Sequence, residues 1–330
     1  MQDLVSRQGC VKYGLFEEPV YSISFQDYDY RTPMGYRLPR ALRKFKAKRF
    51  QFFGICGPKL MLGMAVVDLG YLCSAFMYVY DKRTGKMRQG QGTTPNRNRA
   101  AVEPSPEFPR SWLQGRELSL EMKGERIWAR SREAELHASL RAAHHSPIRL
   151  CTRAGYTGWS YTQKTMPIHL SAELLLGGQR VTLESPEHMG VMDWSGGYMR
   201  RHTFWNWASS SCRLPDGRDM GLNLSCGTNE TSFTENAFWI DGNREKVDTV
   251  HFQYQARKPL LPWRIVSCDG KVDLLFYPEK SKEEKRNALV LATRFTQLMG
   301  SFQGVLITGK GERIEVKDCW GWTEDHYAKW

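Results

Sequence analysis

The densest group of side chains that could carry chemistry lies between Asp193 and Trp239. Asp193 and Glu235 are the candidate general acids, because burial in an apolar pocket raises the pKa of a carboxyl group toward neutrality. His202, which adds an imidazole to the same segment, is the third candidate catalytic residue. Each of the three could instead have a structural role, as a turn cap or as half of an ion pair. The segment therefore predicts acid–base chemistry that needs neither a cofactor nor a metal ion.

Strand periodicity divides the tryptophan-rich stretch 202–209 into two faces. In a strand, His202 and Asn206 point one way, whereas Trp205 and Trp207 point the other. We expect the His202 and Asn206 face to be the polar lining of a cavity, because burying an unpaired polar group in a dry core costs about 1–3 kcal/mol. The tryptophans shape the cavity only if their side of the wall faces inward, and otherwise they fill a core.

Two smaller clusters add to the predicted ligand site. Lys164 lies close to Tyr161 in the chain and could be a general acid, an anion anchor or an ordinary surface lysine. Glu324 and His326 would share one face of a strand and change each other's pKa, or would form a surface pair near the end of the chain. The predicted ligand-binding residues are Tyr161, Lys164, Trp194, Trp205, Asn206, Trp207, Asn223, Asn236, Trp239, Glu324 and His326.

The elements that must position these side chains are short strands. Residues 49–80, 118–142 and much of 168–317 form apolar or alternating runs that end at Gly, Pro or Asp. Asp-Gly pairs that begin at residues 216, 241 and 269 predict hairpin turns between them. We expect a short helix over residues 39–46 and a loop over Gly90–Pro109. This pattern is typical of an all-β chain of antiparallel barrels or sandwiches.

Length and composition indicate two domains. The chain has 330 residues, of which 41% are hydrophobic, and this is enough for a substantial core. We expect an irregular basic segment over residues 1–47, a first β-barrel over 48–165 and a second over 166–330. The sequence lacks the glycine-rich and nucleophile motifs of the familiar nucleotide-binding and hydrolase families.

Much of the formal net charge of +12 comes from the window Arg31–Arg49, which contains eight basic and no acidic residues. An anionic membrane surface is a candidate partner for this window. The alternative is a solvated segment that aids solubility. Nucleic acid is not an expected partner, because aromatic residues are not interleaved there in the way that stacking on bases requires.

The eight cysteines are scattered and form no C-x-x-C pair. We therefore expect buried thiols in a reducing compartment and no zinc site. The first residues lack the apolar run of a secretory signal. The longest apolar stretch, Leu60–Tyr80, is interrupted by polar and turn residues, so it is not expected to span a membrane. These features predict a soluble, cytoplasmic protein.

Several ordered blocks of the sequence resemble a known family. The blocks DWSGGYMRRHTFWNWAS, GLNLSCGTNETSFTENAFWIDG, GSFQGVL and GWTEDHYAKW look like the family named domain of unknown function 2804, over roughly residues 48–330. That family is similar to the carotenoid hydratase and lipocalin-like Diels–Alderase group, which implies two lipocalin-like β-barrels in tandem. In the hydratase-like relatives an Asp-containing block lies near the pocket between the barrels, and Asp193 is the corresponding candidate. Trp194 stands where their blocks have a His, and this departure argues against hydratase chemistry.

Three hypotheses for the function follow. In the first, the protein binds an apolar or amphipathic small molecule, such as a lipid, isoprenoid or polyketide. Any chemistry would then be cofactor-free hydration, isomerisation or cyclisation, as in a lyase or an isomerase. In the second, the protein is a non-catalytic lipid carrier that docks on anionic membranes through Arg31–Arg49. In the third, it is a structural protein with solidly packed barrels and no cavity.

Overall fold

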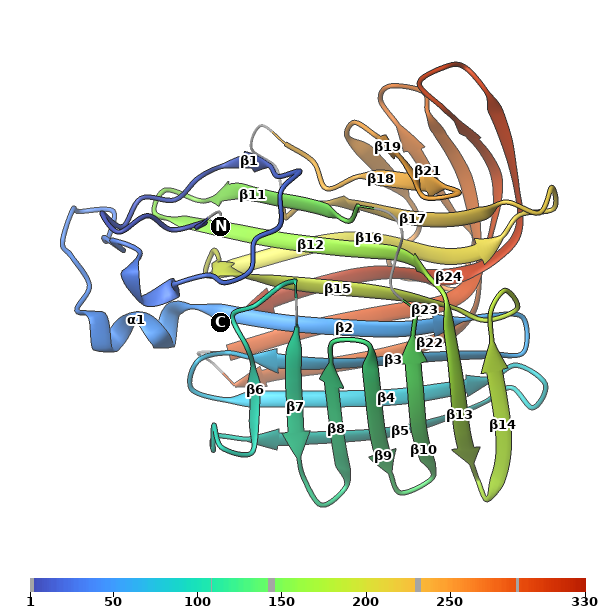
Figure 1. Cartoon of the computed structure of the whole chain (residues 1–330), viewed down its shortest axis with the longest axis horizontal. Helices are drawn as coiled ribbons and strands as arrows, with labels where there is room; N and C mark the ends of the chain where they lie inside the picture. Colours follow the sequence, from blue (N-terminus) through green and yellow to red (C-terminus); the bar gives the residue numbers. More distant parts are fainter. Residues whose placement is uncertain (1–2, 108, 142–145, 229–232, 289–290) are drawn as a thin grey trace.

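The computed structural model describes residues 3–107, 109–141, 146–228, 233–288 and 291–330. These residues form three antiparallel β-sheets (Figure 1). Helical structure within them is confined to η1 (Phe25–Asp27) and α1 (Arg40–Lys46), the second of which matches the helix expected over residues 39–46. The predicted all-β fold class is therefore confirmed.

The middle sheet consists, in spatial order, of β1 (Gly14–Leu15), β11 (Ile148–Ala154), β12 (Gly158–Ile168), β15 (Met189–Tyr198), β2 (Lys48–Cys56), β3 (Leu60–Asp68), β4 (Cys73–Asp81) and β5 (Lys86–Thr94). The first outer sheet consists, in the same sense, of β14 (Gln179–Glu184), β13 (Leu170–Leu176), β10 (Ala134–Leu140), β9 (Arg126–Ser131), β8 (Leu118–Lys123), β7 (Arg110–Gln114) and β6 (Ala100–Val102). The second outer sheet consists of β19 (Asn243–Lys246), β18 (Ala237–Ile240), β17 (Asp219–Cys226), β16 (His202–Arg213), β24 (Arg313–Lys329), β23 (Leu291–Ile307), β22 (Val272–Ala288), β21 (Trp263–Ser267) and β20 (Val250–Gln253).

The middle sheet is covered on both faces. Phe53 and Trp194 belong to a core that it shares with the first outer sheet, whose strands run across β2–β5 (Figure 1). Phe52 points the other way, into a second core with Trp207 and Trp322 of the second outer sheet. Strands buried on both faces lose the alternation of apolar and polar residues. This explains why burial is nearly continuous along β2, β3 and β15.

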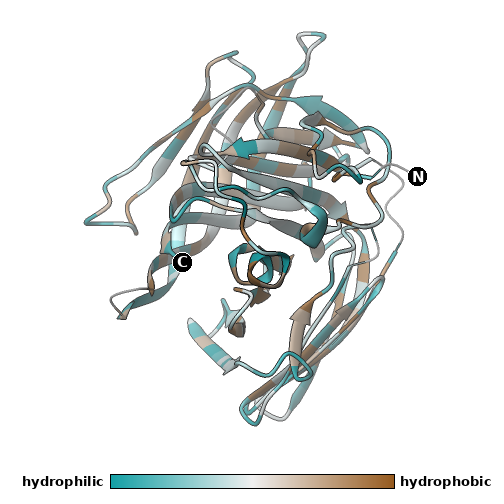
Figure 2. Cartoon of the chain, turned by 90° about the vertical axis from the view of Figure 1, so that its left-hand side faces the viewer, coloured by the Kyte–Doolittle hydropathy of each residue, from teal (hydrophilic) through white to brown (hydrophobic). Residues whose placement is uncertain are grey.

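The two outer sheets keep the alternation that the sequence predicts. Leu118, Leu120 and Met122 of β8 are buried, whereas the residues between them are partly exposed. In Figure 2, hydrophobic and hydrophilic residues alternate along many of the strands. The second outer sheet curves into a half-barrel with a core of its own, which includes Trp263 and Phe302.

The Asp-Gly pairs form hairpin turns as expected. Asp241 and Gly242 join β18 to β19 and have φ values of 46° and 79°. A type I′ turn needs positive φ at both central residues, which Asp and Gly tolerate better than most residues. The pairs that begin at Asp216 and Asp269 likewise lie between paired strands.

Strand pairing does not follow the domain boundary that we expected between residues 165 and 166. That boundary falls inside β12, and the strands that follow it pair with the N-terminal sheets. The second outer sheet begins only at His202, where β16 starts. Alternation along a strand does not determine which strands pair, so it cannot assign β12 and β15 to a sheet.

The N-terminal segment lies against the middle sheet. Val20, Ile23 and Phe25 are buried in the core that this sheet shares with the first outer sheet. Figure 2 shows α1 end-on near the ends of the strands. Acidic residues outside the basic window pair with several of its arginines, in the ion pairs Arg31–Asp29, Arg37–Asp29, Arg40–Asp27 and Arg49–Asp68. The window therefore presents less net positive charge than its own sequence suggests.

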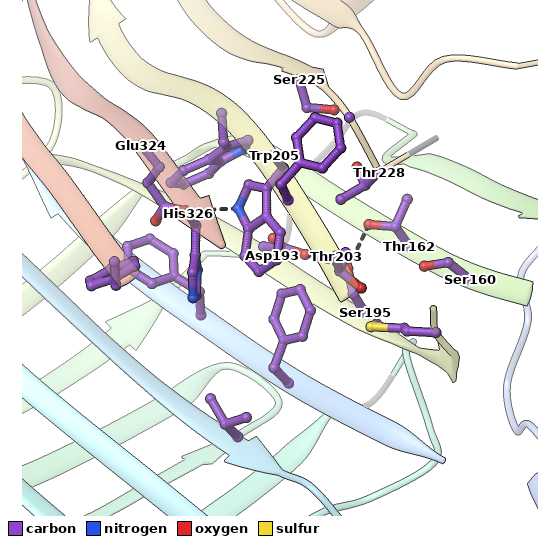
Figure 3. A pocket seen from close by; sticks show the side chains of 18 of the residues that line it. Ser160, Thr162, Asp193, Ser195, Thr203, Trp205, Ser225, Thr228, Glu324 and His326 are labelled. Atoms are coloured by element: carbon purple, nitrogen blue, oxygen red, sulfur yellow. Dashed lines mark hydrogen bonds between the residues drawn. The ribbon is translucent and has the colours of Figure 1, made fainter. Parts of the chain in front are cut away.

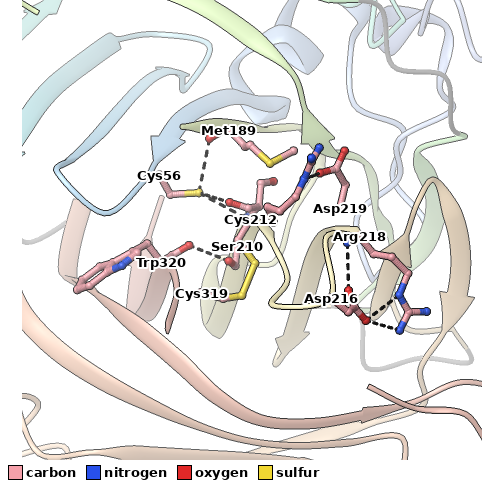
Figure 4. Close-up of a disulfide and its surroundings, with 11 residues drawn as sticks. Cys56, Met189, Ser210, Cys212, Asp216, Arg218, Asp219, Cys319 and Trp320 are labelled. Carbon is pink, nitrogen blue, oxygen red and sulfur yellow. Dashed lines mark hydrogen bonds and ion pairs between the residues drawn. A yellow bond between two sulfur atoms is a disulfide. The ribbon is translucent and has the colours of Figure 1, made fainter. Parts of the chain in front are cut away.

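Two further expectations are corrected by the structure. The loop expected over Gly90–Pro109 contains the end of β5 and all of β6, while residue 108 lies outside the described residues. Cys212 of β16 and Cys319 of β24 form a disulfide across paired strands, with a Cα–Cα distance of 5.6 Å, so these two are not thiols (Figure 4). Within the described ranges, no helix is long and apolar enough to cross a membrane.

Candidate functional site

A pocket of about 150 Å³ lies between the middle sheet and the second outer sheet. Aromatic side chains form much of its wall, and polar side chains enter it from β12, β15, β16 and β24 (Figure 3). Its position follows from the layering, because each of these strands turns one face toward the other sheet. The main lining residues are Phe50, Phe52, Phe76, Thr162, Lys164, Asp193, Ser195, Arg200, His202, Thr203, Trp205, Trp207, Ser225, Glu235, Phe295, Glu324, His326 and Trp330.

Lys164, Asp193 and Glu235 form an ion cluster that lines part of this pocket. Lys164 on β12 and Asp193 on β15 are opposite each other in the strand register. Lys164 Nζ lies 2.5 Å from Asp193 Oδ2 and 3.5 Å from Glu235 Oε1. Ser195 Oγ donates to Asp193 Oδ1 at 2.9 Å, and Thr162 Oγ1 lies 2.7 Å from Ser195 Oγ. One ammonium group thus faces two carboxylates, and all three side chains are buried.

The charges in this cluster are unbalanced. Burial would lower the pKa of Lys164, but the neighbouring carboxylates Asp193 and Glu235 outweigh it and leave that pKa raised. Burial raises the pKa of Asp193, Lys164 opposes this, and Glu235 adds to it. Lys164 is therefore held as a cation, while Asp193 accepts a proton more readily than an ordinary aspartate.

Glu324 is a second acidic group in the same pocket. Its Oε2 accepts a hydrogen bond from Trp205 Nε1 at 3.0 Å, and its Oε1 accepts one from Gln297 Nε2 at 2.6 Å. Tyr78 donates in turn to Gln297 Oε1. Burial raises the pKa of Glu324 to about 7, although the bonds from Trp205 and Gln297 oppose the shift. A carboxyl group with such a pKa can donate or accept a proton near neutral pH.

The two histidines of the pocket differ in environment. The His326 ring packs against the Trp205 ring, with centroids 4.1 Å apart, and His326 Nε2 is 3.0 Å from Thr293 Oγ1. Burial lowers the pKa of His326 to about 3, so it is neutral. His202 lies exposed at the mouth, where its Nδ1 is 2.8 Å from the Tyr327 hydroxyl. Glu324 and His326 both line the pocket, but they do not bond to each other. The carboxylate of Glu324 bonds to Trp205 and Gln297, and His326 bonds to Thr293.

Of the β16 face that we expected to line the cavity, His202 borders the pocket and Asn206 does not. Trp205 and Trp207 line the pocket, whereas Asn206 points into the interior of the second outer sheet. There Asn206 Nδ2 donates to the Tyr254 hydroxyl at 3.0 Å. Periodicity separates the two faces correctly. However, His202 and Phe204 are exposed and Asn206 is half-buried, so a polar residue on this strand does not identify the cavity side.

Five other predicted ligand-binding residues lie outside the pocket. Tyr161 and Trp194 point from β12 and β15 into the core shared with the first outer sheet, because they alternate with Thr162 and Asp193. Asn223 supports the wall, since its Oδ1 accepts from Trp207 Nε1 at 2.8 Å and its Nδ2 donates to Glu235 O at 2.9 Å. The remaining two residues bond to the backbone. Asn236 accepts a hydrogen bond from Ser225 N and donates one to Asp248 O. Trp239 Nε1 donates to Ser146 O.

The sequence predictions did not include several polar residues of this site. Thr162 and Ser195 could have been found, because they lie two residues from Lys164 and Asp193 on the same strand faces. The sequence signal for Gln297 was weaker. It is a polar amide residue that directly precedes the buried residues Leu298 and Met299 on the same strand. Across the described residues, no group of three His, Cys, Asp or Glu side chains could hold a metal ion.

Comparison with known proteins relates the chain to solved folds. No curated protein sequence matches it. CghA with Sch210972 is similar to the chain with a TM-score of 0.54 and 9% identity, over 84% of this chain and 88% of that one. A second CghA structure has a TM-score of 0.50 and 11% identity, over 84% and 87%. At such identities the likeness concerns the fold alone, and it agrees with the predicted lipocalin-like architecture.

Kievitone hydratase from Nectria haematococca is also similar, with 9% identity over 85% of this chain and 88% of that one. Its TM-score is 0.49. The family match is broader than the sequence blocks suggested, since it includes the N-terminal 47 residues. The chain belongs to the family described as domain of unknown function 2804, which matches residues 1–330.

Proposed function

We propose that this protein binds an apolar small molecule between the middle and second outer sheets and moves a proton on it without a cofactor. The observation that carries the proposal is the pairing of an apolar wall with two separate acidic groups. One is Glu324, whose pKa is raised to about 7 by burial. The other is the cluster of Asp193 and Glu235 around Lys164. Two carboxyl sites with different environments are suited to opposite roles in proton transfer.

Glu324 is the proton donor in this proposal. After it donates, its carboxylate keeps the hydrogen bonds from Trp205 Nε1 and Gln297 Nε2, which stabilise the negative charge. Asp193 is the acceptor, because its environment already favours a proton. The ligand gains one proton and loses another, which is the balance of an isomerisation or a cyclisation. Cationic character that develops on the ligand would face the indole of Trp205.

Native mass spectrometry of the purified protein, followed by extraction, tests ligand binding. We expect an apolar compound to co-purify and to be lost in Trp205→Ala. Trp128→Ala is the matched control, since Trp128 lies on β9 in the first outer sheet, away from the pocket lining. The fluorescent apolar probe N-phenyl-1-naphthylamine should bind with the same dependence on Trp205. No co-purifying compound together with no probe binding would refute the proposal.

Incubation of the extracted compound with the protein in D₂O tests the chemistry. Proton transfer should place solvent deuterium on carbon in the compound, and Glu324→Gln should slow this exchange by about a hundredfold or more, as expected when a general acid is removed. Exchange that is equally fast in Glu324→Gln would assign the protein to binding alone.

A further inference from the structure

A second pocket adjoins the mouth of the first. It has a volume of about 530 Å³, and Met199 and Trp330 line both pockets. We call it the rim pocket. It lies where α1, the start of β2 and the connection from β15 to β16 meet, and its wall includes Lys46, Lys48, Tyr71, Tyr198 and Arg201.

The sizes of the two pockets indicate how a ligand would lie. The inner pocket, at about 150 Å³, has room for a group of roughly the size of benzene. Pockets that enclose a drug-sized ligand usually have about 300–1,000 Å³. A ligand larger than such a group would extend past Met199 and Trp330, and the rim pocket is the space that it would enter.

The rim pocket is basic, in contrast to the inner pocket. Lys48 is buried, and its Nζ donates to Phe45 O and Leu69 O at 2.8 Å each, so two of its three N–H donors are engaged. Lys46 and Arg201 lie on the same pocket, and Arg201 Nη1 donates to Trp330 O at 2.6 Å. The described residues that line this wall include these three basic side chains and neither Asp nor Glu.

Asp68 is the acidic side chain that acts on Lys48, and two arginines already share it. Asp68 influences Lys48, but its carboxylate lies 2.6 Å from Arg49 Nη2 and 2.7 Å from Arg97 Nη2. The pKa of Lys48 is lowered to about 8, first by burial and then by the charge of Lys46. An anion in the rim pocket would offset both causes.

Tyr71 provides a second, independent observation. Its hydroxyl oxygen is buried and has no hydrogen-bond partner among the described residues. Lys48 Nζ lies 4.8 Å from the centroid of the same ring. Buried hydroxyl groups are nearly always paired. The Tyr71 hydroxyl and the third N–H of Lys48 are the donors that an oxyanion in the rim pocket would meet.

We infer that the ligand is an amphipathic anion, with a ring-sized apolar group in the inner pocket and its anionic group in the rim pocket on Lys46, Lys48 and Arg201. The inference rests on the proposed function, because it names the class of molecule that the inner pocket takes. Carboxylates, sulfonates and phosphates share the required chemistry.

Two probes with the same ring system test this inference. One is 1-anilinonaphthalene-8-sulfonate, and the other is N-phenyl-1-naphthylamine, which lacks the sulfonate. We expect the sulfonate to bind at least fivefold more tightly at low salt, and the preference to shrink as salt is added. The double variant Lys46→Gln/Arg201→Gln removes two positive charges. It should weaken the binding of the sulfonate probe about tenfold and leave the binding of the neutral probe unchanged. Trp205→Ala should weaken both probes.

Lys44→Gln/Lys12→Gln is the matched control, because it removes the same charge from exposed positions outside the rim pocket. This control should leave the binding of both probes unchanged. If the neutral probe binds equally well and the rim variant behaves like the control, the inference fails while the proposed function stands. If neither probe binds, both fail. Displacement of the neutral probe by decanoate but not by decanol would extend the support to carboxylates.

Discussion

Replacing Glu324 with Gln is the sharpest test of the electrostatics of the pocket. The side chain is nearly fully buried and is held by Trp205 and Gln297. Gln has almost the same volume as Glu and does not titrate. Its amide group would meet one of the two N–H donors, which costs about 1–3 kcal/mol independently of pH. Only the pH-dependent part of the stability difference therefore reports on the proton of Glu324.

The magnitude follows from the pKa of Glu324, which is raised from 4.5 to about 7. The folded state then binds this proton more tightly than the unfolded state does. The resulting stability is complete below the unfolded pKa of 4.5 and is lost as the pH rises through about 7. A pKa difference of about 2.5 corresponds to about 3 kcal/mol. Between pH 4 and pH 8, the free energy of unfolding of the wild type should thus fall by about 3 kcal/mol relative to that of Glu324→Gln.

Urea unfolding at intervals from about pH 4 to pH 8 measures this difference. Glu315→Gln is the control, because Glu315 is an exposed residue on the same strand, β24. Its stability should follow that of the wild type at every pH. A difference between wild type and Glu324→Gln that stays constant within about 0.5 kcal/mol would refute the reasoning, since Glu324 would then keep an ordinary pKa.

Three other changes have expected outcomes that unfolding experiments can measure. Lys164→Met should destabilise the fold by about 3–5 kcal/mol, because two buried carboxylates lose their counter-charge. This destabilisation should be smaller at low pH, where the carboxylates are protonated. Gly54→Ala should cost about 1–3 kcal/mol, since the new Cβ would lie 2.6 Å from the Trp322 ring in the opposite sheet. Reductant should lower the Tm of the wild type but not of Cys212→Ser/Cys319→Ser, because the disulfide joins residues 107 positions apart and such a link contributes about 2–4 kcal/mol.

The strands and their turns could be predicted because their signals are local. The Asp241-Gly242 turn and the alternation of β8 depend only on neighbouring residues. The pairing of β15 with β2 joins residues more than 130 positions apart, and no local pattern encodes it. This is why the boundary that we expected at residue 165 falls inside β12, although most of the strands were identified.

The candidate site was predicted in part for the same reason. Asp193 and Lys164 were recognised separately by residue type, but their contact depends on the register between β12 and β15. Gln297 belongs to no motif, and its role depends on reaching Glu324 from the neighbouring strand. The orientation of β16 could not be predicted, because both of its faces are buried from Trp207 onward, with Trp207 in one core and Ala208 in another.

The middle sheet serves as a common wall for both halves of the molecule. Cutting the chain between β15 and β16 would uncover Phe52, Val191 and their neighbours on one piece and Trp207 and Trp322 on the other. Each fragment would then carry a large apolar face, which favours aggregation. The two pieces should refold efficiently only when they are made together, and the inner pocket should form only in the reassembled pair. The protein is thus suited to a split-complementation assay, in which ligand binding reports the reunion of the halves.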